Sequence, residues 1–247
     1  VFFLPATIDN WKELDKPVTS RFYSAHFCFA DGSFAVEVQH DPEYFFHGEE
    51  ISIGARAYTH GYDLFHPHKP VVWHEYTRKG RVKVWDDHTT ERKNKGKVEL
   101  DWCERNNICH KRNRILFGMD GEDPTQIDFG RYGFGKVRTL HDYEQYAGIS
   151  FKYRSVQQQT YNRSPNHHYP PNTYVYTTEE DWKKTLIRSN DMRILIGVNE
   201  FLQKDFPNGE TPDYDFFYVG CHDVEGKEIF RKDLTQPDID NYLKKNV

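Results

Sequence analysis

The stretch that decides the fold is residues 44–62, which read YFFHGEEISIGARAYTHGY. Ile51, Ala55 and Tyr58 recur at the spacing of one helical face, so this stretch predicts a helix over residues 49–60. Two acids open the helix and suit the positive end of its dipole, and a glycine follows it as the expected C-cap. The neighbouring segments are placed around this helix.

Segments on both sides of the helix have the pattern of strands. Residues 21–29 and 34–38 are rich in aromatic and β-branched side chains and flank an Asp-Gly pair, so they predict a hairpin. After the helix, residues 62–65 and 71–76 predict two further strands, separated by a link that contains two prolines. The sequence therefore predicts four strands around the first helix.

A polar and charged region follows these strands. Residues 77–97 predict an exposed loop, which is either a lid over a site or an inert linker. A second helix is predicted over residues 98–116. The glycine-rich residues 129–135 have the spacing G-x-x-G-x-G, which is not the dinucleotide-binding pattern, so they predict a turn. Thr139 and Asp142 are typical of the first turn of a third helix.

A linker rich in proline, asparagine and histidine, residues 162–172, marks the predicted domain boundary, and a boundary near Gly148 stays open. The linker separates a large domain over residues 1–165 from a small α+β accessory domain over residues 173–247. The elements predicted after the linker are a helix opened by Thr178 and Asp181 that runs to about Ser189, strands over 192–198 and 214–222, a turn at 225–226 into a strand over 228–231, and a terminal helix that begins at Thr235 and Pro237.

The composition bounds the class of protein. The chain of 247 residues has 16% aromatic residues, a formal net charge of −5 and a pI near 6.2, so we expect no nucleic-acid partner. No run of eighteen apolar residues occurs, and we therefore expect no membrane span. The four cysteines form no C-x-x-C pair, which favours a reduced, cytoplasmic setting without a zinc site or a disulfide framework.

Glu49, Glu50 and His74 are the residues with the clearest chemical potential. A divalent cation held by carboxylate and imidazole ligands can neutralise a diphosphate leaving group, and a nearby carboxylate can bind sugar hydroxyls. Purely structural roles for these residues stay open. Two acids at a helix start often only complement the helix dipole, and a histidine in an apolar strand can be a core residue. A separate metal site is a further alternative, built from His60, His66, His68 and His74.

Three motifs carry a resemblance to a known family: residues 44–51, residues 58–62 and residues 73–78, which read YFFHGEEI, YTHGY and WHEYTR. They resemble the polypeptide α-N-acetylglucosaminyltransferases and, more distantly, the polypeptide N-acetylgalactosaminyltransferases. His74 follows Glu49 by 25 positions, as in that pattern. The resemblance is strongest over residues 20–78. It implies an α/β fold, namely the C-terminal portion of a GT-A (Rossmann-like) nucleotide-sugar transferase domain, followed by the accessory domain.

The resemblance also implies roles for individual residues. His74 matches the histidine that completes the metal site for Mn²⁺ or Mg²⁺, and Glu49 matches the acid that contacts the donor sugar, with Glu50 in support. The residues it implies for substrate binding are Ala25, His26, Asp41, Gly48 and Arg78. His26 departs from the glycine of the family. Trp85 is added as part of the possible lid, with Arg78, Arg81, Asp86, Asp87 and His88.

The resemblance implies a retaining transferase that moves N-acetylglucosamine from UDP-GlcNAc to a hydroxyl of a protein or glycan acceptor. No aspartate-x-aspartate or aspartate-x-histidine motif precedes Glu49, although such enzymes use one to bind metal and nucleotide. Residues 213–215 and 238–240 have the pattern but follow His74, and we interpret them as surface acids. The alternative function is a non-catalytic GT-A-like module that binds carbohydrate or polypeptide, and a histidine metalloprotein is a third.

Overall fold

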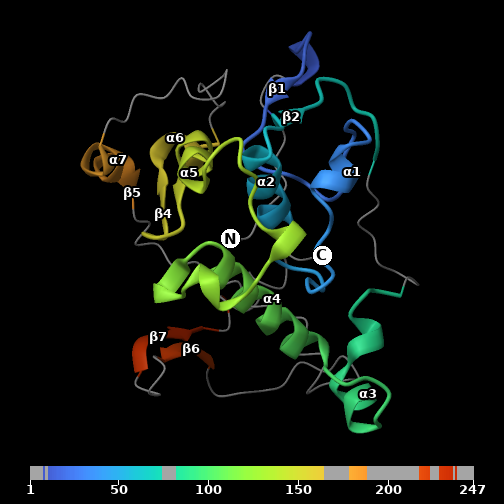
Figure 1. Cartoon of the computed structure of the whole chain (residues 1–247). Helices are drawn as coiled ribbons and strands as arrows, with labels where there is room; N and C mark the ends of the chain where they lie inside the picture. The colour runs from blue at the N-terminus through green and yellow to red at the C-terminus, as the bar shows by residue number, and fades with distance from the viewer. Residues whose placement is uncertain are drawn as a thin grey trace. The chain divides into compact units, whose positions relative to one another are not determined.

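The computed structural model describes Ile8, residues 11–73, 82–163, 178–187, 217–222 and 228–235, and Pro237 (Figure 1). The chain divides into two compact units, Val1–Ser189 and Asn190–Val247. Among the described residues, the first unit contains the longer helices and two small antiparallel sheets, and the second contains one hairpin. The described part of the chain is therefore a mixed helix and strand protein.

Helix α2 (Glu49–Thr59) is the centre of the first unit, and every residue from Ile51 to Thr59 is buried. It lies between α1 (Phe34–Glu37) and α5 (Leu140–Ala147) in Figure 1. The predicted helix over 49–60 is confirmed, with His60 as C-cap and Gly61 at a φ of +103°. Because α2 is buried along nearly its whole length, packing fixes its position and therefore the position of Glu49 and Glu50 in its first turn.

Two further helices begin where their capping residues predict. The Asp101 side chain caps α4 (Trp102–Leu116) by accepting the Glu104 N–H at 3.0 Å, and the Glu104 carboxylate accepts the Asp101 N–H. Thr139 and Asp142 form the same reciprocal pair at the start of α5. The helix predicted after Thr139 is therefore confirmed, and the helix predicted over 98–116 is confirmed except for its start, which lies at Trp102 because Asp101 caps it.

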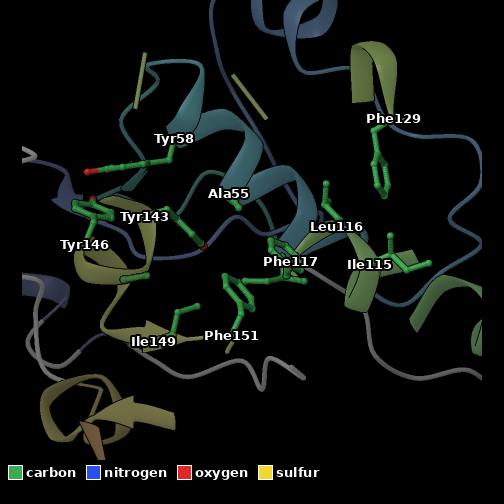
Figure 2. Packing of buried hydrophobic residues seen from close by; sticks show 12 residues of the cluster. Ala55, Tyr58, Ile115, Leu116, Phe117, Phe129, Tyr143, Tyr146, Ile149 and Phe151 are labelled. Atoms are coloured by element: carbon green, nitrogen blue, oxygen red, sulfur yellow. The ribbon is translucent and has the colours of Figure 1, made fainter. Parts of the chain in front are cut away.

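The main core lies between α2, α4 and α5, and Figure 2 shows its side chains. The Phe117 and Phe151 rings stack at 3.9 Å between centroids, and Tyr58 stacks on Tyr146 at 4.7 Å. A smaller cluster lies on the other side of α2, where Ile53 and Ala57 pack with Val38, Phe34 and their neighbours. The aromatic residues thus provide much of the buried surface that holds α2.

The sheets are short and antiparallel. β1 (Val18–Thr19) pairs with β2 (Phe65–His66), and β3 (Ile149–Ser150), β4 (Ser155–Gln157) and β5 (Leu186–Ile187) form a three-stranded sheet. The short α6 (Gln158–Tyr161) follows β4 directly. The other short helical turns are η1 (Trp11–Glu13), η3 (Met119–Gly121), η4 (Pro124–Gln126) and η5 (Gly130–Tyr132).

The hairpin predicted over residues 21–38 is wrong. Asp31 accepts the Ser33 N–H at 2.9 Å in a side-chain turn, and α1 follows it, so the Asp-Gly pair leads into a helix and not into a second strand. Of the strand predicted over 62–65, only Phe65 lies in β2. Residues 71–73 form no strand, and the rest of that predicted strand lies outside the described residues.

The loop predicted over 77–97 is partly helical in its described residues. It contains η2 (Asp86–His88) and α3 (Thr90–Asn94), whose first turn is capped by the Thr89 side chain at 3.2 Å from the Arg92 N–H. Most of its side chains are exposed or half-buried, as predicted. The loop prediction missed Thr89 as an N-cap, which is the local reason for α3.

Helix α7 (Glu179–Thr185) begins after Thr178 as predicted, but it belongs to the first compact unit, because β5 follows it and pairs with β4. Packing therefore divides the chain after Ser189, later than the linker over 162–172 that composition favours. In the second unit, β6 (Phe217–His222) pairs antiparallel with β7 (Glu228–Leu234), close to the predicted strands. The strand predicted over 192–198 lies outside the described residues.

Candidate functional site at the first turn of helix α2

The turn that leads into α2 is held by α4. Tyr44 donates its hydroxyl hydrogen to Asn113 Oδ1 at 2.5 Å, and Asn113 Nδ2 donates to the Gly48 carbonyl at 3.0 Å. Gly48 has a φ of +95°, and a Cβ atom there would lie 2.5 Å from Asn113 Nδ2. Glycine is therefore required at this position, both for the backbone conformation and for the close approach of the amide.

A buried ion pair anchors the start of the same loop. The Asp41 side chain is 2% exposed, and its Oδ2 accepts bonds from Arg112 Nη2 at 2.7 Å and Nε at 2.8 Å. Its Oδ1 accepts the Glu43 N–H at 3.1 Å, and Arg112 also lies over the Phe129 ring. Both oxygens of Asp41 thus have partners within the protein, which places the residue as a support of the loop.

Glu49 opens α2 with a half-buried carboxylate. Burial raises its pKa above the ordinary value for glutamate, and the neighbouring Glu50 carboxylate raises the pKa further. The Oε2 atom is buried and has no hydrogen-bond partner among the described residues. A buried acceptor without a partner is uncommon and costs free energy, which is typical of a group that meets a ligand.

Glu50 contacts a distant segment. Its Oε1 accepts the N–H of Ala25 at 2.8 Å, so the structure brings together two of the predicted site residues. On the same segment, the Tyr23 hydroxyl lies near the Cys28 thiol. Burial first, then Cys28 and the two carboxylates, raise the pKa of Tyr23 to about 12, so the phenol is neutral at physiological pH. The sequence analysis did not identify Tyr23 or Cys28, and no local motif marks either residue.

Two tyrosines of α5 hold the beginning of this segment. The Tyr143 hydroxyl donates to the Arg21 carbonyl at 3.1 Å, and the Tyr146 hydroxyl donates to the Ser20 carbonyl at 2.9 Å. A Cβ atom at Gly54 would lie 3.3 Å from the Tyr23 nitrogen, so the segment passes directly over the second turn of α2. The segment therefore lies against α2, whose first turn carries the Glu49 and Glu50 carboxylates.

Aromatic rings extend the site along the loop before Gly48. Trp85 meets Phe46 edge to face at 5.4 Å between centroids. His88 lies 4.9 Å from the Phe45 ring, and Arg105 Nη1 donates to His88 Nε2 at 3.2 Å. The structure thus brings Trp85 to the loop that precedes Glu49.

The remaining predicted site residues are less enclosed or lie outside the described part. The His26 side chain is exposed and its Nδ1 shares a hydrogen bond of 3.1 Å with the Ser24 hydroxyl. His74 and Arg78 lie outside the described residues, as do residues 213–215 and 238–240. Within the described ranges, no group of three or more histidine, cysteine, aspartate or glutamate side chains could hold a metal ion, so His60, His66 and His68 do not form such a group there.

The comparisons with known proteins identify the class. A family model described as "Glycosyltransferase (GlcNAc)" matches residues 3–153, more than half of the chain. The chain belongs to this glycosyltransferase family. The predicted resemblance is confirmed at that level. No curated protein and no solved structure gives a match.

The region shared with the glycosyltransferase family encloses the whole site. It spans the segment of Tyr23, the loop with Asp41, the first turn of α2 and the aromatic contact of Trp85. It also spans α4 and α5, which hold these parts in place, and it ends just after β3. Among the described residues of this glycosyltransferase, no helix has both the length and the apolar character that crossing a membrane requires.

Proposed function

We propose that this glycosyltransferase moves N-acetylglucosamine from UDP-GlcNAc to a hydroxyl of a protein or glycan acceptor, with retention of configuration, as the acceptor-side part of a GT-A domain. The observation that carries the proposal is the buried Oε2 atom of Glu49, which has no hydrogen-bond partner among the described residues and lies at the start of a buried helix within the family region. Such a carboxylate is placed to accept hydrogen bonds from sugar hydroxyls.

The roles of the other residues follow from their positions. Glu50 binds the Ala25 N–H beside Glu49, and Gly48 lets the Asn113 amide lie close to the main chain. Asp41 fixes the loop through Arg112 and acts on the substrate indirectly. Trp85, reached through Phe46, and the exposed His26 are proposed to contact the donor or the acceptor at the rim. Arg78 is proposed to assist the leaving phosphate.

A divalent cation, Mn²⁺ or Mg²⁺, would neutralise the diphosphate when bound. His74 is the residue of this chain that we propose to hold it, and the described residues add no three-ligand group of their own. Carboxylate, carbonyl and water oxygens are the preferred ligands of both ions, so the imidazole of His74 would be one ligand in a site that oxygen atoms complete. Retention needs no protein base if the leaving phosphate accepts the acceptor proton on the same face.

The test uses the full chain, UDP-GlcNAc and Mn²⁺, with donor hydrolysis as a readout that needs no known acceptor. We expect Glu49→Gln to lower turnover about 100-fold while UDP affinity stays the same, since the lost interaction is with the sugar. His74→Ala should remove the dependence on Mn²⁺. Glu43→Gln is the matched control, because Glu43 is an exposed acid of the same loop.

Two results would contradict the proposal. Full turnover in the Glu49→Gln variant would show that Glu49 only complements the helix dipole. If calorimetry finds no UDP binding that depends on Mn²⁺, the chain is a binding module of GT-A type and not a transferase.

A further inference from the structure

Residues 20–33 carry groups of the site but contain no helix or strand, although all of them are described. Their position therefore depends on tertiary contacts. At the start, the main-chain carbonyls of Ser20 and Arg21 are bound by tyrosines of α5. At the end, α1 begins with Phe34, which packs in the small core cluster beside α2. Between these ends, the Ala25 N–H is bound by Glu50.

The Ala25 contact lies between Tyr23 and Cys28 in the sequence. Tyr23 precedes it by two residues and Cys28 follows it by three, and the Tyr23 hydroxyl lies close enough to Cys28 and to both carboxylates for each of them to raise its pKa. The Tyr23 ring also stacks on Phe34 at 6.3 Å, so the ring is held independently of its hydroxyl. The main-chain bond at Ala25 thus ties the middle of residues 23–28 to the first turn of α2.

We propose that Glu50 is a positioning residue, which fixes residues 23–28 against the first turn of α2 so that the Tyr23 hydroxyl and the Cys28 thiol line the sugar site beside Glu49. The two acids then have different tasks. The Glu49 Oε2 atom has no hydrogen-bond partner among the described residues and is assigned to the ligand. Glu50 instead uses its Oε1 atom to accept a main-chain N–H. This role rests on the proposed function, since it assigns a task within the same site.

Two variants of Glu50 separate positioning from direct action on the substrate. Glu50→Gln keeps a carbonyl oxygen that can accept the Ala25 N–H, whereas Glu50→Ala removes it. Amide hydrogen exchange at Ala25, measured by NMR on the full chain, should become about tenfold faster in the alanine variant. The glutamine variant should stay within about threefold of the wild type. Glu43→Ala is the control, because it removes an exposed acid of the loop before α2, whereas the Ala25 N–H is bound by Glu50.

Turnover should follow the same order. We expect kcat/KM for UDP-GlcNAc to fall about tenfold in the Glu50→Ala variant, and the glutamine variant to recover most of it. Equal losses in both variants would overturn the proposal, because they would show that the charge of Glu50 acts on the substrate. Unchanged exchange at Ala25 in the alanine variant would overturn it as well. If the wild type has no transferase or hydrolase activity, the proposed function fails, and the exchange experiment still decides the role of Glu50.

Discussion

Replacing Gly48 by alanine should destabilise the first compact unit and damage the site. An L-residue at a φ of +95° is strained by about 1–2 kcal/mol. The new methyl group would also lie 2.5 Å from Asn113 Nδ2 and displace that amide. Asn113 joins Tyr44 to the Gly48 carbonyl through two hydrogen bonds, each of which contributes about 1 kcal/mol. We therefore expect Gly48→Ala to lower the free energy of unfolding by about 2–4 kcal/mol.

Two other glycines separate the parts of this effect. Gly96 has a φ of +66° with open space around it, so Gly96→Ala should cost only the strain, about 1 kcal/mol. Gly32 has open space and no positive φ, and Gly32→Ala should change stability by less than about 0.5 kcal/mol. The measurement is urea denaturation of each variant, followed by circular dichroism and by tryptophan fluorescence.

The order of the three variants is the critical result. If Gly48→Ala is no more destabilising than Gly96→Ala, the Asn113 amide does not fix the turn, and the account of how α4 holds the site is wrong. A Gly48→Ala protein of normal stability that also keeps full turnover would refute the closer claim that glycine is required there.

Two further predictions concern the acids of the site. Asp41→Asn should lower the free energy of unfolding by about 3 kcal/mol in urea denaturation, because it leaves the Arg112 charge buried without a counter-ion; a loss below about 1 kcal/mol would contradict the buried pair. For Glu49, the folded-state pKa is raised, so its ionised form destabilises the fold. This penalty is absent below the unfolded pKa of about 4.3 and complete above the folded pKa. Glu49→Gln should therefore gain stability relative to the wild type as pH rises from about 4 to 8, and a constant difference in urea midpoints would contradict the raised pKa.

The helices were predictable because their signals are local. The capping pairs Asp101 with Glu104 and Thr139 with Asp142 lie within one turn, and the glycine after α2 is adjacent to the helix it ends. The helical spacing of apolar residues on one face was enough to predict α2, although α2 is buried on nearly all sides.

The failures have the opposite cause. Aromatic residues over 21–29 suggested a strand, but tertiary contacts with α2 and α5 hold this segment, and a single sequence does not show such contacts. The same reason explains why only part of the candidate site could be predicted. Glu49 and Glu50 were predicted from their charge at a helix start and from a family pattern, and Trp85 from its place in a charged loop. Asn113 and Arg112 act across 65 to 71 positions and have no local signature. Tyr23 and Cys28 are significant only once the Ala25 contact is known.

The loop over residues 41–48 takes its shape from one face of α4. Arg112 binds its start, the Cys109 sulfur accepts the Phe45 N–H at 3.0 Å, and Asn113 binds its end. These contacts close chain loops of about 65 residues, which is slow compared with helix formation. During synthesis, the loop over residues 41–48 can therefore take its native form only after α4 has left the ribosome.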